Sequence, residues 1–288
     1  MDTKELQEKI YSKIDELPTL PVVVPKLLEL MEDKKSSAAD VTEIISNDPA
    51  LVSKIMKVAN SAYYGFPQQI DDVERAVPLL GFNMVRSLAL SLGVINSLPG
   101  AKESAWFSQE GLWMHSLAVA TIMKQMGGFL GQQQAGYQFI IGLLHDIGKL
   151  VLDQFFNDQF MEVLERTNTT EGKNLHTTEK EVIGIDHNEI SAMLLKRWKF
   201  PKAIIYPIMS LHHKKLNAET SHFDVALLRV ANSIAQELNF GLEGNSTPNS
   251  VSEGDIAVLM TTPEKLAGIK QSIEKKREGI TSFLSAIL

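Results

Sequence analysis

Apolar residues recur at three- and four-residue spacing along almost the whole chain, and this periodicity is the strongest constraint on its fold. Such spacing buries one face of a helix, whereas a half-buried strand needs strict alternation, and no segment shows convincing alternation. Helix-start signals agree with this interpretation. Asp48 followed by Pro49 predicts the start of one helix, and Thr178 with Glu181 predicts a capping box at the start of another. The sequence therefore predicts an all-α fold.

The spacing of turn signals along the chain predicts two helical lobes and a C-terminal extension. Residues 1–100 contain short helices separated by closely spaced turn signals, and we assign them to an N-terminal helical lobe. Longer helical patterns fill residues 101–240, which hold all the histidines of the chain. Residues 241–288 begin with a stretch rich in Gly, Ser, Asn and Pro, which predicts a loop, and end in a further helix.

Composition excludes several classes of function. The chain contains no cysteine, so thiol nucleophiles, cysteine zinc sites and disulfides are ruled out. Its net charge of −7 disfavours general binding of nucleic acid, because phosphate contacts need clustered Lys and Arg. The polar N-terminus lacks the features of a signal peptide, and no stretch approaches the roughly 18 to 20 apolar residues of a transmembrane helix. We expect a cytoplasmic protein with neither nucleic-acid nor membrane partners.

His145 and Asp146 form an ionisable pair directly after the apolar run Phe-Ile-Ile-Gly-Leu-Leu. Burial of such a pair without partners costs several kcal/mol, and a divalent metal such as Fe, Mn or Zn would compensate. Adjacent helical residues point about 100° apart, so the pair reaches one ion only from a distorted turn. Otherwise the two side chains serve two neighbouring ions. Lys149 lies one turn beyond His145 and either places its charge on a phosphate oxygen or is a surface lysine.

Further histidines join this pair along the chain. His115 lies on an apolar helical segment, His187 follows Gly-Ile-Asp, and two adjacent histidines close the helix that begins near residue 201. Each also has a structural interpretation: a hydrogen-bonded core histidine, a helix cap, and a favourable charge at a helix C-terminus. Only the joint pattern favours a metal site with one or two ions. The candidate ligands are His115, His145, Asp146, His187, His212 and His213, whereas His176 and His222 are interpreted as surface residues.

The order of these residues resembles the HD superfamily of phosphohydrolases, particularly its cyclic-dinucleotide phosphodiesterase branch, HD-GYP. Motifs in the first lobe are similar to those of HDOD domains, a regulatory branch of that superfamily. They are Leu-Pro-Thr-Leu-Pro at 17–21, Ile-Ser-Asn-Asp-Pro-Ala-Leu at 45–51, Val-Ala-Asn-Ser-Ala at 58–62, Val-Pro-Leu-Leu-Gly at 77–81, Trp-Met-His-Ser at 113–116 and Trp-Lys-Phe-Pro at 198–201. The resemblance covers about residues 14–240.

The resemblance implies a helical, HD-like core in a bacterial signal-transduction protein, a type often without detectable catalysis. It makes the six residues above candidate metal ligands, and it makes Asp146 and Lys149 candidate catalytic residues. Two departures from the HD pattern matter. Asn232 stands where a late aspartate is expected, and an amide is a weaker ligand than a carboxylate. Lys-Lys-Leu-Asn at 214–217 replaces the Asp-Gly-x-Gly-Tyr-Pro stretch of HD-GYP enzymes.

Three functions are open at this point. The first is a regulatory or adaptor module with a bound metal, which acts by binding a signalling protein. The alternative is a degenerate or residual metal-dependent phosphohydrolase acting on a nucleotide or another phosphoester, in which the metal activates water and Lys149 stabilises charge. The third, a di-iron sensor of redox state or a gas, has no residue that selects iron over manganese or zinc.

Overall fold

A computed structural model describes residues 3–17, 19–33, 35–98, 100, 103–131, 135–170, 173–213, 222–241, 243–244 and 248–288. Within these ranges the chain folds into helices and connecting turns, without a strand. An isolated bridge pairs Phe107 with Glu243. The predicted all-α fold is confirmed.

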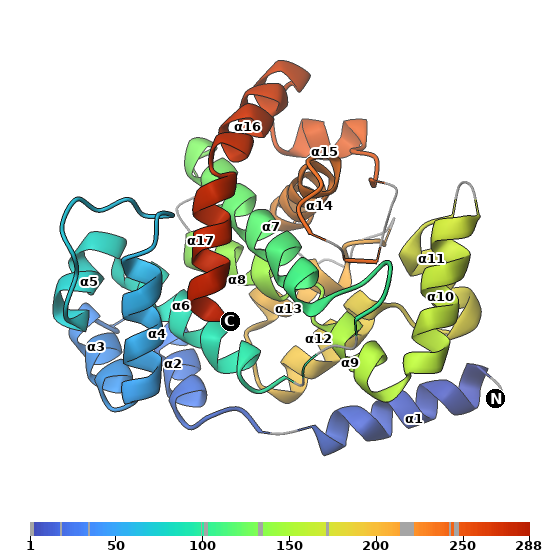
Figure 1. The fold of residues 1–288 in the computed structure, drawn as a ribbon, viewed down its shortest axis with the longest axis horizontal. Helices are drawn as coiled ribbons and strands as arrows, with labels where there is room; N and C mark the ends of the chain where they lie inside the picture. The colour runs from blue at the N-terminus through green and yellow to red at the C-terminus, as the bar shows by residue number, and fades with distance from the viewer. Residues whose placement is uncertain are drawn as a thin grey trace.

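The helices follow one another closely along the chain (Figure 1). The first group comprises α1 (Thr3–Glu16), α2 (Val23–Glu32), α3 (Ala38–Ser46), α4 (Pro49–Ala59), α5 (Val73–Leu80) and α6 (Phe82–Ile95). The central group comprises α7 (Gln109–Phe129), α8 (Ala135–Leu144), α9 (Gly148–Phe155), α10 (Asn157–Thr169), α11 (Leu175–Val182), α12 (His187–Arg197) and α13 (Lys202–Met209). The last group comprises α14 (His222–Glu237), α15 (Glu253–Val258), α16 (Pro263–Lys275) and α17 (Arg277–Ile287).

Figure 1 shows α2–α6 gathered on one side of the molecule and α8–α15 on the other. Helix α6 packs against α8, and α17 packs against both α4 and α7, so the C-terminal helix bridges the two groups. Helix α1 runs along the base of the molecule and contacts α12. Buried apolar side chains from both groups form one contiguous cluster, which holds the two sides together mainly by removing apolar surface from water.

Helix α7 lies at the centre of this core, and its sequence explains why. Trp113, Leu117, Val119 and Ile122 point to different sides of the helix, and all are fully buried. A helix that is apolar on nearly all sides is stable only when other helices surround it. His115 belongs to the same helix and is therefore carried into the interior.

The two helix-start predictions have different outcomes. Asp48 caps α4 by accepting a hydrogen bond from the amide of Leu51 at 3.0 Å, and Pro49 is the first helical residue, as predicted. The predicted capping box of Thr178 and Glu181 is wrong. Asn174 caps α11 by accepting from the amide of Thr177, so the helix starts several residues earlier and Thr178 is buried inside it.

No single helix in the described ranges combines the length and apolar content needed to cross a bilayer. The pair α5 and α6 passes this criterion together, but a bend of 115° separates the two helices.

Candidate metal centre

His145 and Asp146 occupy a short non-helical turn between α8 and α9, and both side chains are almost fully buried. Two glycines allow the neighbouring helices to come close to this turn. A Cβ on Gly142 would lie 2.5 Å from the Cα of Ala120 on α7, and a Cβ on Gly148 would lie 2.0 Å from the carbonyl oxygen of His187 on α12. The absence of side chains at 142 and 148 therefore brings α7 and α12 within reach of Asp146.

The imidazole of His145 presents a free lone pair to the Asp146 carboxylate. Its Nδ1 lies 2.8 Å from the carbonyl oxygen of Gly142, which can only accept, so Nδ1 carries the proton. Burial lowers the pKa of His145 to about 4, so the ring is neutral and Nε2 is unprotonated. This Nε2 lies 3.2 Å from Asp146 Oδ1 and has no hydrogen-bond donor among the described residues. Two acceptors facing each other repel unless a cation lies between them.

His115 completes the group from α7. Its Nε2 lies 3.9 Å from Asp146 Oδ2, and neither ring nitrogen has a hydrogen-bond partner in the described part of the chain. Burial lowers the pKa of His115 as well, so a second neutral imidazole faces the carboxylate. Donor atoms of His115, His145 and Asp146 lie within 4.8 Å of one another. Two orphaned imidazole nitrogens beside a carboxylate are a donor set that fits a divalent transition metal.

His187 approaches Asp146 from the start of α12. Its Nε2 lies 3.3 Å from Asp146 Oδ1, while its Nδ1 lies 2.6 Å from Oε2 of the buried Glu179. Burial alone would lower the pKa of His187, but the charges of Glu179 and Asp146 outweigh it and raise this pKa to about 10. A carboxylate that orients the far nitrogen of a histidine is also the usual partner of a metal-bound imidazole.

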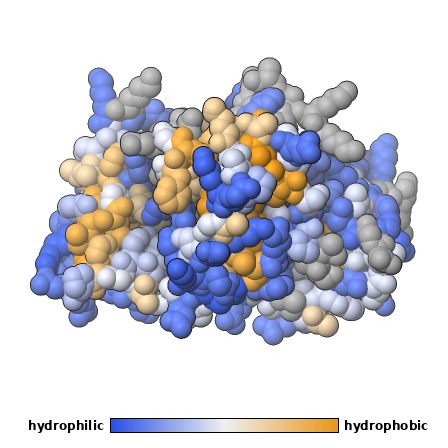
Figure 2. All heavy atoms as spheres, turned by 90° about the horizontal axis from the view of Figure 1, so that it is seen from above, coloured by the Kyte–Doolittle hydropathy of each residue, from blue (hydrophilic) through white to orange (hydrophobic). Residues whose placement is uncertain are grey.

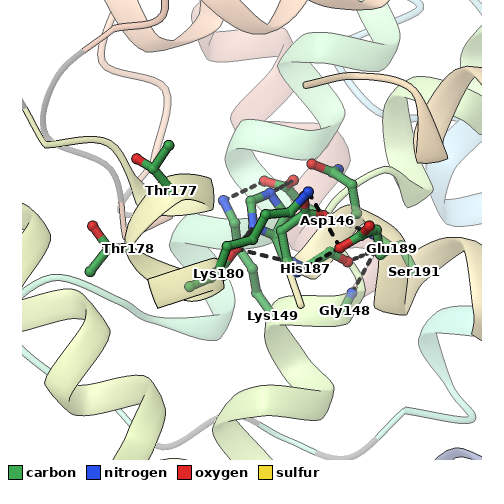
Figure 3. A network of polar contacts seen from close by, with 12 residues as sticks. Asp146, Gly148, Lys149, Thr177, Thr178, Lys180, His187, Glu189 and Ser191 are labelled. Carbon is green, nitrogen blue, oxygen red and sulfur yellow. Dashed lines mark hydrogen bonds and ion pairs between the residues drawn. The ribbon is translucent and has the colours of Figure 1, made fainter. Parts of the chain in front are cut away.

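Lys149 adds a cation to the same cluster. Its ammonium group lies 2.6 Å from Asp146 Oδ2 and also forms an ion pair with Glu243, and all three side chains are almost fully buried. Burial opposes the charged form, but the two carboxylates outweigh it and raise the pKa of Lys149 above its ordinary value. Burial opposes the charged form of Asp146, but His145, Lys149 and His187 outweigh it and hold the pKa of Asp146 well below its usual range. Figure 3 shows Lys149 and His187 converging on Asp146.

His212 lies at the edge of this cluster, in a small polar cavity. The cavity is lined by Asp146, Lys149, Leu175, His176, His187, His212, Asn232, Gln236, Glu243 and Asn249. The His212 ring stacks on His176 at 3.9 Å between centroids and meets His187 edge-on at 5.7 Å. Asn232 of α14 lines the same cavity beside His115, and we call its position the fourth corner of the candidate metal centre.

His213 lies apart from the other predicted ligands. Its Nε2 lies 3.9 Å from Glu189 Oε1, and these two residues with Asp186 form a separate group of donor atoms. Lys180 pairs with Asp186 at 3.0 Å and with Glu189 at 3.6 Å, so a lysine already neutralises this second group. Figure 3 shows Lys180 beside Glu189.

The sequence analysis did not assign Glu179, Glu243 or His176 to this cluster. Glu179 reads as one charge in a polar Glu-Lys-Glu run, and Glu243 lies in a loop, so neither has a local signal. The interpretation of His176 as a surface residue is wrong: it is half-buried and stacked on His212. His222, by contrast, is exposed as predicted.

Comparisons with known proteins agree with this fold. The HDOD domain model matches residues 17–214, and the chain therefore belongs to the HDOD domain family. A crystal structure from Shewanella amazonensis, provisionally named a phosphohydrolase, superposes with a TM-score of 0.76 at 24% identity, covering 97% of this chain and 98% of that one. A second, from Marinobacter aquaeolei and provisionally named a signal transduction protein, has a TM-score of 0.84 at 19% identity, covering 99% of this chain and 65% of that one.

Among curated proteins, an uncharacterised protein of Treponema pallidum is 27% identical over 219 residues. The match covers 73% of this chain but 40% of the Treponema protein, so this chain spans less than half the length of that relative. At these identities the solved structures establish a shared HD-like fold.

Proposed function

We propose that the chain is a regulatory adaptor module of bacterial signal transduction, which acts by binding another signalling protein and does not hydrolyse phosphoesters. The observation that carries this proposal is the burial of the Lys149 ammonium between Asp146 and Glu243. A lysine that stabilises a phosphoryl group must present its charge to the substrate. Here that charge is already shared between two carboxylates, and a phosphate would have to break a buried ion pair to reach it.

The amide of Asn232 also favours the adaptor proposal. Its Oδ1 is buried beside the neutral imidazole of His115 and has no hydrogen-bond partner among the described residues. An uncharged amide at this corner leaves Asp146 as the only carboxylate of the His115, His145 and Asp146 group. This favours one ion over two, since hydrolytic two-metal sites use several anionic ligands.

The metal part of the proposal assigns His115, His145 and Asp146 as ligands of one divalent ion, with His187 oriented toward it by Glu179. When bound, the ion would supply Lewis-acid chemistry. The described residues perform separate tasks. Glu179 holds the proton of His187 Nδ1, Gly142 fixes the tautomer of His145, and Lys149 balances the charge of Asp146.

The decisive experiment measures metal content and turnover together. Protein purified without an affinity tag is analysed by elemental mass spectrometry and assayed on bis(p-nitrophenyl) phosphate, a nucleoside triphosphate and a cyclic dinucleotide with added Mn²⁺, Fe²⁺ or Zn²⁺. We expect about one metal equivalent, lost in Asp146→Ala, and turnover no higher in the wild type than in that variant. Turnover that disappears in Asp146→Ala would overturn the adaptor assignment.

The second candidate is a metal-dependent phosphohydrolase, and one observation favours it. A polar cleft lies outside the small cavity and shares His176, His212, Asn232 and Asn249 with it. Arg229 also lines this cleft, which gives a small anion a polar route toward the metal centre. The turnover assay above separates the two candidates.

A further inference from the structure

An apolar groove lies between the C-terminal end of α7 and one face of α16. Met126, Phe129 and Leu130 form one wall, and Lys265, Gly268 and Ile269 form the other. Phe129 is 75% exposed, a large value for an aromatic side chain on a helix that is otherwise central to the core. Figure 2 looks onto the end of the molecule where α15 and α16 lie, and apolar side chains gather there between hydrophilic ones.

A second apolar side chain beside the groove is held in a strained conformation. Met260 directly precedes Thr261, which also lines the groove, and its own side chain is 76% exposed. Its backbone φ of 48° lies in the left-handed region, where glycine or asparagine usually ends a helix. A methionine exposed at such a position gains nothing from burial within this chain, which favours a role in contact with another molecule.

The lining of the groove carries a positive charge. Lys265 lines it, and no carboxylate is among its described lining residues. Lys276 and Lys124 lie near the far end; the first donates to Gln125 Oε1 at 2.6 Å, and the second lies over the ring of Tyr64. Burial and the neighbouring Lys276 lower the pKa of Lys124. Glu264 and Glu274 lie on α16 outside this lining, and Glu274 pairs with Arg277 at 2.8 Å.

The shape of the groove fits a helix. Lys265, Gly268, Ile269 and Ser272 form one stripe of α16 at helical spacing, about 10 Å long at 1.5 Å per residue. A Cβ added to Gly268 would meet nothing within 4 Å, so the floor of the groove is open there. An amphipathic helix binds such a surface by placing apolar residues spaced three and four apart into it.

We infer that this groove is the docking site for an acidic amphipathic helix of a partner protein. The inference rests on the proposed adaptor role and names the kind of partner that the adaptor binds. The apolar face of the partner helix covers Phe129, Leu130 and Ile269, while its flanking carboxylates pair with Lys265 and Lys276.

The test uses the full chain and two synthetic helical peptides of about 18 residues, compared by fluorescence anisotropy. Both peptides carry the same leucine stripe; one has Glu and the other Lys at the flanking positions. We expect the Glu peptide to bind at least tenfold more tightly than the Lys peptide. Lys265→Glu should weaken the Glu peptide about fivefold and strengthen the Lys peptide, as removal of one partly exposed charge pair predicts.

Gly268→Leu and Gly268→Ala form the matched pair of variants. Both replace a helical glycine and favour the helix, but only leucine fills the groove. We expect at least tenfold weaker binding of the Glu peptide to Gly268→Leu, and wild-type binding to Gly268→Ala. Equal binding by the two variants, or equal binding of the two peptides, would overturn the inference.

Two further measurements test whether the groove instead binds a second copy of this chain or a membrane. A dimer in sedimentation velocity that Phe129→Ser dissociates would assign the groove to a second copy of this chain instead. Binding to phosphatidylglycerol vesicles that Gly268→Leu abolishes would assign it to a membrane surface. Either result overturns the helix proposal, whereas phosphoesterase turnover tests the adaptor role separately and leaves the peptide result unaffected.

Discussion

The ammonium group of Lys149 lies 2.6 Å from the carboxylate of Asp146 and also pairs with Glu243, so one buried cation joins the turn after α8 to the loop after α14. Glu243 thereby lines the cavity beside the histidine cluster. This link was not evident from the sequence, where 94 residues separate Lys149 from Glu243.

Removal of this cation is predicted to destabilise the fold strongly. Lys149→Met leaves the buried Glu243 without a positive partner and Asp146 with His187 alone, and breaking a buried pair costs about 3–5 kcal/mol. Urea unfolding of chelator-treated protein would measure the loss. Lys270→Met is the matched control, because Lys270 pairs with Glu237 on the partly exposed surface and such pairs contribute about 0–1 kcal/mol. A Lys149→Met variant as stable as this control would contradict the geometry.

The stability of metal-free protein should fall at alkaline pH. Glu179 and Asp146, working against burial, raise the pKa of His187 to about 10, whereas an unfolded histidine titrates near about 6.5. The folded chain thus holds this proton more tightly than the unfolded chain. The resulting stabilisation is complete below about pH 6.5 and is lost as the pH rises toward 10, with a total on the order of a few kcal/mol.

Glu179→Gln should flatten this dependence, because the amide removes the charge that raises the pKa of His187. Urea unfolding at several pH values between 6.5 and 10, with a chelator present, would measure the slope. Glu181→Gln serves as the control, since Glu181 is exposed and pairs with Lys173. An equal slope in wild type and Glu179→Gln would show that this carboxylate does not hold the proton on His187.

The sequence predicted the distorted turn at His145 and Asp146 better than it predicted which other residues lie around that turn. The His145–Asp146 pair was expected to need a distorted turn to serve one ion, and the turn between α8 and α9 has that form. Helical spacing could place His115 and His187 on buried faces, but their convergence depends on how closely α7 and α12 approach the turn. That approach is set by backbone contacts at Gly142 and Gly148, which periodicity does not report.

Glu179 and Glu243 could not be predicted as part of the site, because no local sequence pattern marks them. Glu179 and Glu243 are charged side chains in polar surroundings, which ordinarily face water. Their burial follows from partners distant in the sequence, His187 in one case and Lys149 in the other. The capping prediction at Thr178 failed because a nearby asparagine supplied the same hydrogen bond earlier in the chain.

Gly148 is predicted to be intolerant of even one added carbon. A Cβ there would lie 2.0 Å from the carbonyl oxygen of His187, so α9 and α12 would have to separate. Overpacking of this kind costs about 1–3 kcal/mol, and it would also move His187 away from Asp146. Gly148→Ala should therefore lower both the midpoint of thermal unfolding and the metal content. Gly268→Ala, which meets no atom within 4 Å, should leave both unchanged or raise stability slightly.

Asn232→Asp should convert the fourth corner of the centre into a metal ligand. The buried Oδ1 of Asn232 has no hydrogen-bond partner in the described ranges and lies in the same cavity wall as Asp146. A carboxylate there is a stronger ligand than an amide, so we expect at least tenfold tighter binding of Mn²⁺ or Zn²⁺. Without metal the same charge adds to that of Asp146 in a buried site and should destabilise the chain.

The effect of Asn232→Asp on stability should therefore reverse with metal: the variant unfolds at lower urea than wild type in chelator and at higher urea in excess metal. Asn83→Asp, on a half-buried amide of α6 that accepts a hydrogen bond from Arg86, should show no such dependence on metal. If Asn232→Asp is destabilised equally in both conditions, the cavity does not bind the ion through this corner.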